Sequence, residues 1–173
     1  MKKNILLIGF MGVGKGSTAR AFSKKYGVFN IDTDDIIESM ENREIKRIFE
    51  KKGEKYFRKL EQKTADWIEC CVDDTLISCG GGFYMVNNMK KLGHVVFLDA
   101  SFEWIYNRLK NAKNSKKKLA KRPLFSDPDA AMELYEKRKE AYLALSNTVI
   151  DLEIRNLDEV LSDIAAAVGI DKK

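Results

Sequence analysis

Short apolar runs alternate along the chain with longer stretches of helical periodicity. The runs are brief and rich in β-branched residues, so they predict five strands. These strands cover Ile5–Ile8, Val28–Ile31, Thr75–Ser78, Val95–Leu98 and Thr148–Ile150. Strands that alternate with helices are typical of a parallel α/β sheet.

The stretches between the strands carry apolar residues every three or four positions, which predicts helices. We expect them at Ser17–Tyr26, Asp34–Met40, Ile45–Lys52, Glu54–Cys71, Val86–Leu92, Phe102–Asn111, Ala130–Leu145 and Leu157–Val168. Three glycines follow predicted helices directly, at Gly27, Gly53 and Gly93. Glycine adopts the left-handed conformation that ends many helices, so we expect helix C-caps at these positions.

The length of 173 residues and a hydrophobic content of 45% fit one compact domain over residues 1–173. The 31 Lys and Arg residues against 26 Asp and Glu give a net charge of +5. A modestly basic surface suits an anionic small ligand as well as nucleic acid, so composition alone does not separate the two.

The three cysteines, Cys70, Cys71 and Cys79, are not in a C-x-x-C arrangement, so neither a disulfide framework nor a zinc site is indicated. No apolar segment reaches the roughly 18 residues of a membrane helix. We therefore expect a reduced, cytoplasmic protein with no membrane partner.

The segment Gly9–Thr18, GFMGVGKGST, joins the first predicted strand to the first helix. Its glycines allow backbone N–H groups to surround phosphate oxygens, and Lys15 supplies a cation. The pattern G-x-x-x-x-G-K is normally followed by Ser or Thr, whose hydroxyl reaches Mg²⁺. Gly16 stands at that position, so the loop predicts a nucleotide site without its usual metal ligand.

Asp32 and Asp34 lie two residues apart at the end of the second predicted strand, so their side chains share a face. The carboxyl ends of parallel strands border the crevice in which ligands bind. In such a crevice, one carboxylate of the pair could lie near a metal and the other near an acceptor hydroxyl. The alternative is that either Asp only caps the helix that follows.

Two further segments are candidates for binding. Arg58 and Glu61 are three residues apart on a predicted helix and can pair, although alone they would be read as a surface ion pair. Gly80, Gly81 and Gly82 follow a strand, where glycines allow a ligand to approach the backbone closely; a flexible turn is the alternative.

Residues 112–123, AKNSKKKLAKRP, are rich in lysine and nearly devoid of large apolar side chains. A solvated loop is one interpretation of this composition. Beside a nucleotide site, a basic segment that contains Arg122 is also a candidate lid over phosphates.

Taken in order, GFMGxGK, DTD, GExxFRxxE, GGG, RPL and YEKR resemble shikimate kinase, over Gly9 to about Asn156. The resemblance implies a nucleoside monophosphate kinase-like P-loop fold, three layers α/β/α around a five-stranded parallel sheet of order 2-3-1-4-5. We expect a substrate-binding helical segment at about 33–61 and a lid at about 112–124, and nothing in the sequence suggests more than a monomer. The resemblance also implies transfer of the γ-phosphoryl of ATP to the 3-hydroxyl of shikimate with Mg²⁺, in aromatic amino acid biosynthesis.

The resemblance also assigns roles to single residues. Lys15, Asp34 and Arg122 would be catalytic, with Arg122 descending with the lid and Asp34 binding the shikimate hydroxyls. Asp32 would act on the metal through water. Ser17 is a candidate metal ligand, but it cannot simply substitute for a hydroxyl at position 16, because adjacent helical positions are about 100° apart around the axis. ATP would contact Gly12, Val13, Gly14, Lys15, Gly16, Ser17, Thr18, Arg108, Arg122 and Arg155. Shikimate would contact Asp34, Phe49, Phe57, Arg58, Gly80, Gly81, Gly82 and Arg138.

The sequence departs from the family pattern at Gly16, at Cys79, where Thr or Ser is usual, and in the length of the lysine-rich segment. Gly after the lysine also resembles adenylate kinases, so a nucleoside monophosphate kinase is the nearest alternative, although no DGFPR-like segment is present. A catalytically impaired paralogue is a second alternative. A nucleic-acid binder is a third, but the basic segment lacks aromatic residues for base stacking.

Overall fold

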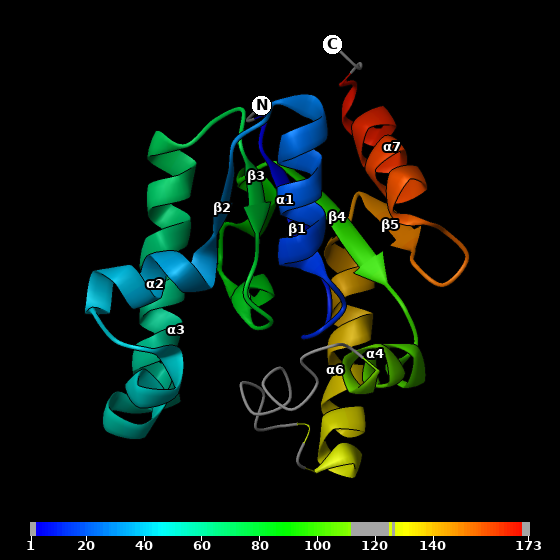
Figure 1. Ribbon diagram of the computed structural model, residues 1–173. Coiled ribbons are helices and arrows are strands. Elements are labelled where there is room, and N and C mark those ends of the chain that lie inside the picture. Colours follow the sequence, from blue (N-terminus) through cyan, green and yellow to red (C-terminus); the bar gives the residue numbers. More distant parts are fainter. Residues whose placement is uncertain (1–2, 112–124, 126, 171–173) are drawn as a thin grey trace.

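The computed structural model describes residues 3–111, 125 and 127–170, and Figure 1 shows a central sheet with helices around it. The sheet is parallel and has the order β2-β3-β1-β4-β5, which confirms the expected fold class. Its strands are β1 (Ile5–Ile8), β2 (Asn30–Asp32), β3 (Leu76–Ser78), β4 (His94–Asp99) and β5 (Thr148–Asp151). The β2–β3 register pairs Asp32 with Ser78, which puts two polar residues side by side at the carboxyl edge.

Six α-helices surround the sheet within the described residues. They are α1 (Lys15–Tyr26), α2 (Thr33–Glu41), α3 (Ile45–Cys71), α4 (Phe102–Lys110), α6 (Pro128–Leu145) and α7 (Leu157–Val168). The predicted C-cap at Gly27 is confirmed: it has φ 71° and donates its N–H to the carbonyl of Ser23 at the end of α1.

Alternate residues of β1 face opposite layers, as the strand period requires. Ile5 and Leu7 pack with residues of α1, α4 and α7, while Leu6 and Ile8 pack with residues of α3 and α6. The sheet is therefore buried on both faces, which explains why its strands read as continuous apolar runs. A third, smaller cluster joins α2 to α3 through Ile37, Ile48, Phe57 and Leu60.

The predicted helix at Val86–Leu92 is wrong. The chain forms two short 3₁₀ turns there, Phe83–Met85 and Met89–Lys91. The amide of Asn88 donates to Glu69 and accepts from Gln62, and Gln62 also accepts the backbone N–H of Asn87. These bonds to α3 tie the two asparagines to another element, and such bonds compete with a continuous helix.

Three predictions about the ends of elements differ from the structure. The second strand begins at Asn30 and not at Val28, and Phe29 before it is 85% exposed. Gly53 is not a C-cap; it lies within α3, where φ 76° and ψ 172° interrupt the helix at the predicted junction. Gly93 is not a C-cap either, because Leu92 follows the 3₁₀ turn and Gly93, with φ 154°, packs directly against Asn4.

In the part of the chain that the structure describes, no helix combines the length and apolar character needed to cross a bilayer.

Candidate active site

The segment Gly9–Thr18, here called the glycine loop, connects β1 to the first turn of α1. Gly14 immediately precedes the helix with φ 116° and ψ 13°, a conformation that L-residues rarely adopt. A Cβ atom at this position would also lie 2.6 Å from Nη1 of Arg108. Glycine is therefore required here by both the backbone and its neighbour, and the loop's amides lie at the positive end of α1.

Lys15 folds back across this loop. Its Nζ donates to the carbonyl oxygens of Gly9, at 2.7 Å, and Phe10, at 3.3 Å. Burial lowers the pKa of Lys15 to about 8, although Asp34 and Asp32 partly oppose this. The ammonium thus stands at the mouth of the loop, within a cluster that also holds two carboxylates.

The alternative interpretation of the DTD segment, helix capping, holds for Asp32. It caps α2, because its Oδ1 accepts the backbone N–H of Asp34 at 3.0 Å. Asp34 is held in the first turn of α2, where burial and the neighbouring Asp32 raise its pKa to about 7. A carboxyl group with this pKa changes its proton occupancy near neutral pH.

Gly80–Gly82, here called the triple-glycine segment, follows β3 and touches three charged side chains. An added Cβ would overlap Asp34 at Gly80 and Arg58 at Gly82, and it would lie 2.9 Å from Nη1 of Arg138 at Gly81. The N–H of Gly80 also donates to Oγ1 of Thr33 at 2.8 Å. The segment is glycine because α2, α3 and α6 each bring a charged group directly against it.

The guanidinium of Arg58 is fixed from two sides. Its Nη1 donates to Oε2 of Glu61 at 2.6 Å, and its Nη2 donates to Glu54 at 2.7 Å. Glu61 is only 2% exposed, and burial raises its pKa, although the pairing with Arg58 opposes that shift. The predicted pairing of Arg58 with Glu61 is confirmed, but the pair lies in the site and not on an open surface.

Arg138 projects from α6 and is 9% exposed. Sequence reasoning missed its neighbour Tyr142, whose hydroxyl donates to the carbonyl of Gly81 at 2.7 Å. Burial raises the pKa of this hydroxyl, so it stays protonated and remains a donor. The spacing of four residues on one helix face was the available signal.

Phe49 and Phe57 lie together on either side of the break at Gly53. Their ring centroids are 4.7 Å apart, and Phe57 is buried while Phe49 is partly exposed. The structure therefore brings these two predicted residues onto one apolar wall beside Arg58, whose guanidinium lies 5.7 Å from the centre of the Phe57 ring.

The three remaining arginines differ in placement. Arg108 of α4 donates to the carbonyls of Gly12, at 3.2 Å, and Val13, at 2.6 Å, and lies over the ring of Trp104. Burial lowers its pKa. Arg155, between β5 and α7, hydrogen-bonds to Asp163 and to the carbonyl of Asp151. Arg122 and the predicted lid, 112–124, lie outside the described residues.

Positions 16 to 18 have distinct surroundings on α1. Ser17 is exposed, and Thr18 is 5% exposed. A Cβ at Gly16 would lie 3.4 Å from Nη1 of Arg20, 3.9 Å from Oδ2 of Asp32 and 4.0 Å from Oγ of Ser78. Position 16 thus faces the carboxylate at the end of β2, whereas the neighbouring Ser17 faces solvent.

Cys79 is buried in the core and lies within electrostatic range of Lys15, Asp32 and Asp34. It is 1% exposed and packs with the residues between the sheet and α3. Burial raises the pKa of its thiol far above the usual range. The substitution at this position therefore fills apolar space with an un-ionised thiol.

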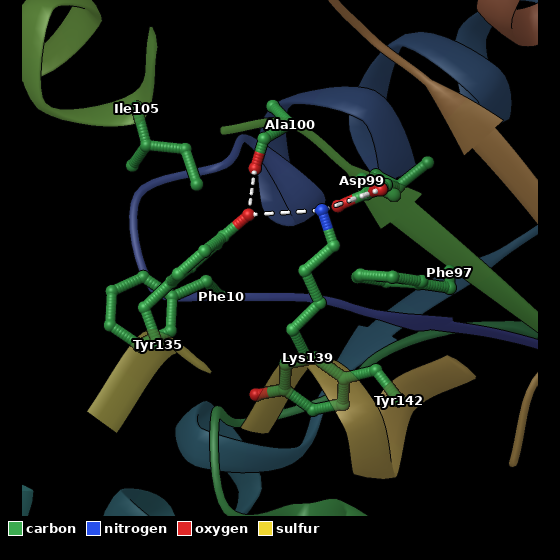
Figure 2. Close-up of a pocket in the computed structure, with 9 residues that line it drawn as sticks. Phe10, Phe97, Asp99, Ala100, Ile105, Tyr135, Lys139 and Tyr142 are labelled. Atoms are coloured by element: carbon green, nitrogen blue, oxygen red, sulfur yellow. Dashed lines mark hydrogen bonds and ion pairs between the residues drawn. The ribbon is translucent and has the colours of Figure 1, made fainter. Parts of the chain in front are cut away.

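A network at the end of β4 binds the face of α6 that also carries Tyr142, and Figure 2 shows it lining a small pocket. Lys139 pairs with Asp99 at 3.2 Å and donates to the hydroxyl of Tyr135, which donates to the carbonyl of Ala100 at 2.9 Å. Burial lowers the pKa of Lys139, but its bonds to Tyr135 and Asp99 outweigh this and raise it. This network thus anchors α6 beside Arg138, which faces the triple-glycine segment.

Among the described residues, no group of three or more His, Cys, Asp and Glu side chains is arranged to hold a metal ion by itself. Asp32, beside the glycine loop, is nevertheless suited to a hard cation that keeps most of its waters.

Comparisons with known proteins place the chain in one family. A sequence model of the shikimate kinase family matches residues 11–168. A shikimate kinase from Helicobacter hepaticus is 41% identical over 149 residues, 86% of each chain. The crystal structure of shikimate kinase from Aquifex aeolicus is 33% identical with a TM-score of 0.75 and covers 96% of both chains. Shikimate kinase from Acinetobacter baumannii in complex with shikimate is 26% identical with a TM-score of 0.80, covering 95% of this chain and 92% of the other.

Proposed function

This chain belongs to the shikimate kinase family and is an ATP-dependent kinase, and we propose how its residues transfer the γ-phosphoryl of ATP to the 3-hydroxyl of shikimate. The products are ADP and shikimate 3-phosphate. The observation that carries the proposal is the convergence of Asp34, Arg58 and Arg138 on three consecutive glycines next to the glycine loop. A carboxylate and two guanidinium groups around a backbone segment without side chains match a ligand with one carboxylate and several hydroxyls.

Arg58 and Arg138 bind the carboxylate of shikimate. Two planar guanidinium forks hold a carboxylate in a fixed orientation, which a pair of lysines would not do. Glu61 and Glu54 hold Arg58 in position, and Tyr142 holds the triple-glycine segment against α6. Phe49 and Phe57 pack against the ring of the ligand, and Gly80–Gly82 allow it to approach the backbone.

The glycine loop binds the phosphates of ATP. Lys15 exchanges its bonds to the Gly9 and Phe10 carbonyls for the β- and γ-phosphates, and Arg108 and Arg155 flank the adenine. Arg122 approaches the transferring phosphate from the segment 112–124. Phosphoryl transfer passes through a loose transition state, so fixed positive charge and alignment contribute more than a strong base.

Asp34 binds the reacting hydroxyl and accepts its proton. With a pKa near 7 it is largely ionised at slightly alkaline pH, and it is basic enough to take a proton as the new bond to phosphorus forms. Asp34 is then reset by release of that proton to solvent with the products.

Mg²⁺ completes the proposed site. The ion would neutralise charge on the β- and γ-phosphates, and Asp32 would order its water ligands. Ser17 stays a candidate ligand from the sequence, although it is exposed on α1. The proposal also retains a monomeric, cytoplasmic enzyme in which residues 33–61 bind the acceptor and 112–124 form the lid.

The direct test is ADP release with shikimate as acceptor, followed in a coupled assay. We expect Mg²⁺-dependent turnover with shikimate and only background turnover with nucleoside monophosphates. Arg138→Ala should raise the KM for shikimate by about 100-fold, because removal of a charged partner from a buried ligand carboxylate costs roughly 3 kcal/mol. The neighbouring exposed Lys137→Ala is the matched control and should leave KM unchanged. Turnover with a nucleoside monophosphate in place of shikimate would reject the assignment.

A further inference from the structure

The glycine loop has no hydroxyl at position 16, but the hydroxyl of Ser78 lies close to that position. Ser78 is the last residue of β3, and its Oγ lies 4.0 Å from the point where a Cβ at position 16 would stand. The same point is 3.9 Å from Oδ2 of Asp32. Ser78 and Asp32 are register partners in neighbouring strands, so their side chains emerge on the same face of the sheet.

The hydroxyl of Ser78 is available for a further hydrogen bond. Ser78 is 2% exposed, and no hydrogen bond of its hydroxyl is found among the described residues, although its Oγ is not one of the fully buried side-chain atoms without a partner. Beside a ligand site, such a hydroxyl can bind a ligand group or an ordered water. The neighbouring Thr33 shows the contrast, since its hydroxyl accepts the N–H of Gly80.

We propose that Ser78 is a positioning residue for Mg²⁺ in the nucleotide complex, in which its hydroxyl accepts a hydrogen bond from a metal-bound water that Asp32 also holds. This inference rests on the proposed Mg²⁺-dependent kinase function. Ser78 compensates from β3 for the hydroxyl that Gly16 does not supply from α1. The metal is then held by phosphates and by waters that two adjacent strands order.

The test is the effect of Mg²⁺ on ADP affinity, measured by titration calorimetry with Mg²⁺ and with EDTA. We expect Ser78→Ala to reduce the Mg²⁺-dependent gain in affinity by about 10-fold, the usual loss when a partner of metal-bound groups is removed. Affinity in EDTA should change less than about 2-fold. Ser162→Ala, which removes a hydroxyl that bonds to Asp158 within α7, is the matched control and should leave both affinities unchanged.

A double-mutant cycle makes the test specific. Gly16→Ser should restore the Mg²⁺ effect in the Ser78→Ala background but add little to the wild type, because the two hydroxyls serve the same ion. Gly16→Ala should not restore it. If Ser78→Ala does not fold, Ser78→Cys, which keeps the size but weakens the acceptor, replaces it and should show the same loss.

The outcomes separate this inference from the function on which it rests. A folded Ser78→Ala protein with an unchanged Mg²⁺ effect would overturn the role of Ser78. So would loss of the effect in Ser17→Ala alone, which would assign the role to that exposed hydroxyl. A wild-type protein that does not phosphorylate shikimate would reject the proposed function itself, whatever the Ser78 variants show.

Discussion

Asp34 and Lys15 have pKa values that are displaced toward neutrality from opposite sides. Burial and Asp32 raise the pKa of Asp34 to about 7, and burial lowers that of Lys15 to about 8. Each group also stabilises the charge of the other, which limits both shifts. The pair therefore changes its combined charge within the range in which an enzyme normally works.

We predict a bell-shaped pH dependence of kcat/KM for shikimate. Activity should rise through about pH 7, where Asp34 loses its proton, and fall above about pH 8, where Lys15 loses its positive charge. Initial rates from pH 5.5 to 9.5 measure both limbs. In Asp34→Asn, the residual activity should no longer rise through about pH 7. Any pH dependence that comes from titration of ATP should remain. A rising limb of the same midpoint in this variant would contradict the assignment to Asp34.

Gly14 and Gly16 of the glycine loop differ in how well their positions accommodate a side chain. Gly16 is in a helical turn with ordinary contact distances around an added Cβ, whereas Gly14 has a positive φ and meets Arg108. We predict that Gly16→Ala raises the free energy of unfolding by about 0.5 kcal/mol, because alanine is the better helix former. Gly14→Ala should lower it by about 2 kcal/mol. Urea denaturation measures both, and equal effects of the two substitutions would show that the loop geometry is misjudged.

At the scale of elements, α3 is the part that shapes the acceptor pocket. Its residues before Gly53 carry Phe49, and those after it carry Phe57, Arg58 and Glu61. The break allows the first part to pack on α2 and return Phe49 to Phe57. In an unbroken helix, Phe49 and Phe57 would be eight residues apart, and their positions would be separated by about 12 Å along the helix axis.

We predict that Gly53→Ala raises the KM for shikimate several-fold and lowers stability by about 2 kcal/mol. The conformation at φ 76° and ψ 172° is accessible essentially to glycine alone, so the break must change. Gly27→Ala is the control, since it also has a positive φ and no atom within 4 Å of an added Cβ, but it ends α1 at a distance from Phe49. It should cost about 1 kcal/mol with no change in KM. A KM effect of the same size in both variants would mean that general destabilisation is responsible.

Local patterns predicted most of the elements because strands buried on both faces and amphipathic helices leave clear periodicities. The strand Ile5–Ile8 and the helix Leu157–Val168 have the predicted bounds. The glycine loop was predictable because its glycines adopt local conformations that other residues rarely do. The predicted helix at Val86–Leu92 was wrong because Asn87 and Asn88 form hydrogen bonds with α3, 19 to 26 residues earlier in the chain. The contacts of Gly80–Gly82 with charged side chains could not be predicted either. They depend on how α2, α3 and α6 pack around one loop.

Across the whole molecule, α6 ties the triple-glycine segment to the end of β4. Arg138 and Tyr142 meet the triple-glycine segment, and Tyr135 and Lys139, on the same face of the helix, bind the end of β4 (Figure 2). Asp99 is partly buried, and its Oδ1 has no partner among the described residues, so Lys139 neutralises a costly charge. The position of Arg138 therefore depends on contacts made by neighbouring residues along one face of α6.

Two Tyr→Phe substitutions on this helix distinguish positioning of the ligand from anchoring of the fold. Tyr142→Phe removes the bond to the Gly81 carbonyl, and we predict a rise of about 5-fold in the KM for shikimate with kcat and the KM for ATP nearly unchanged, as expected for a lost hydrogen bond of about 1 kcal/mol. Tyr135→Phe removes the equivalent bond to Ala100 and should lower stability by about 1 kcal/mol without changing the KM for shikimate. Steady-state kinetics and urea denaturation of both variants provide the measurement. If both raise the KM equally, Tyr142 acts only through the general attachment of α6, and the Gly81 bond has no separate part in holding the acceptor.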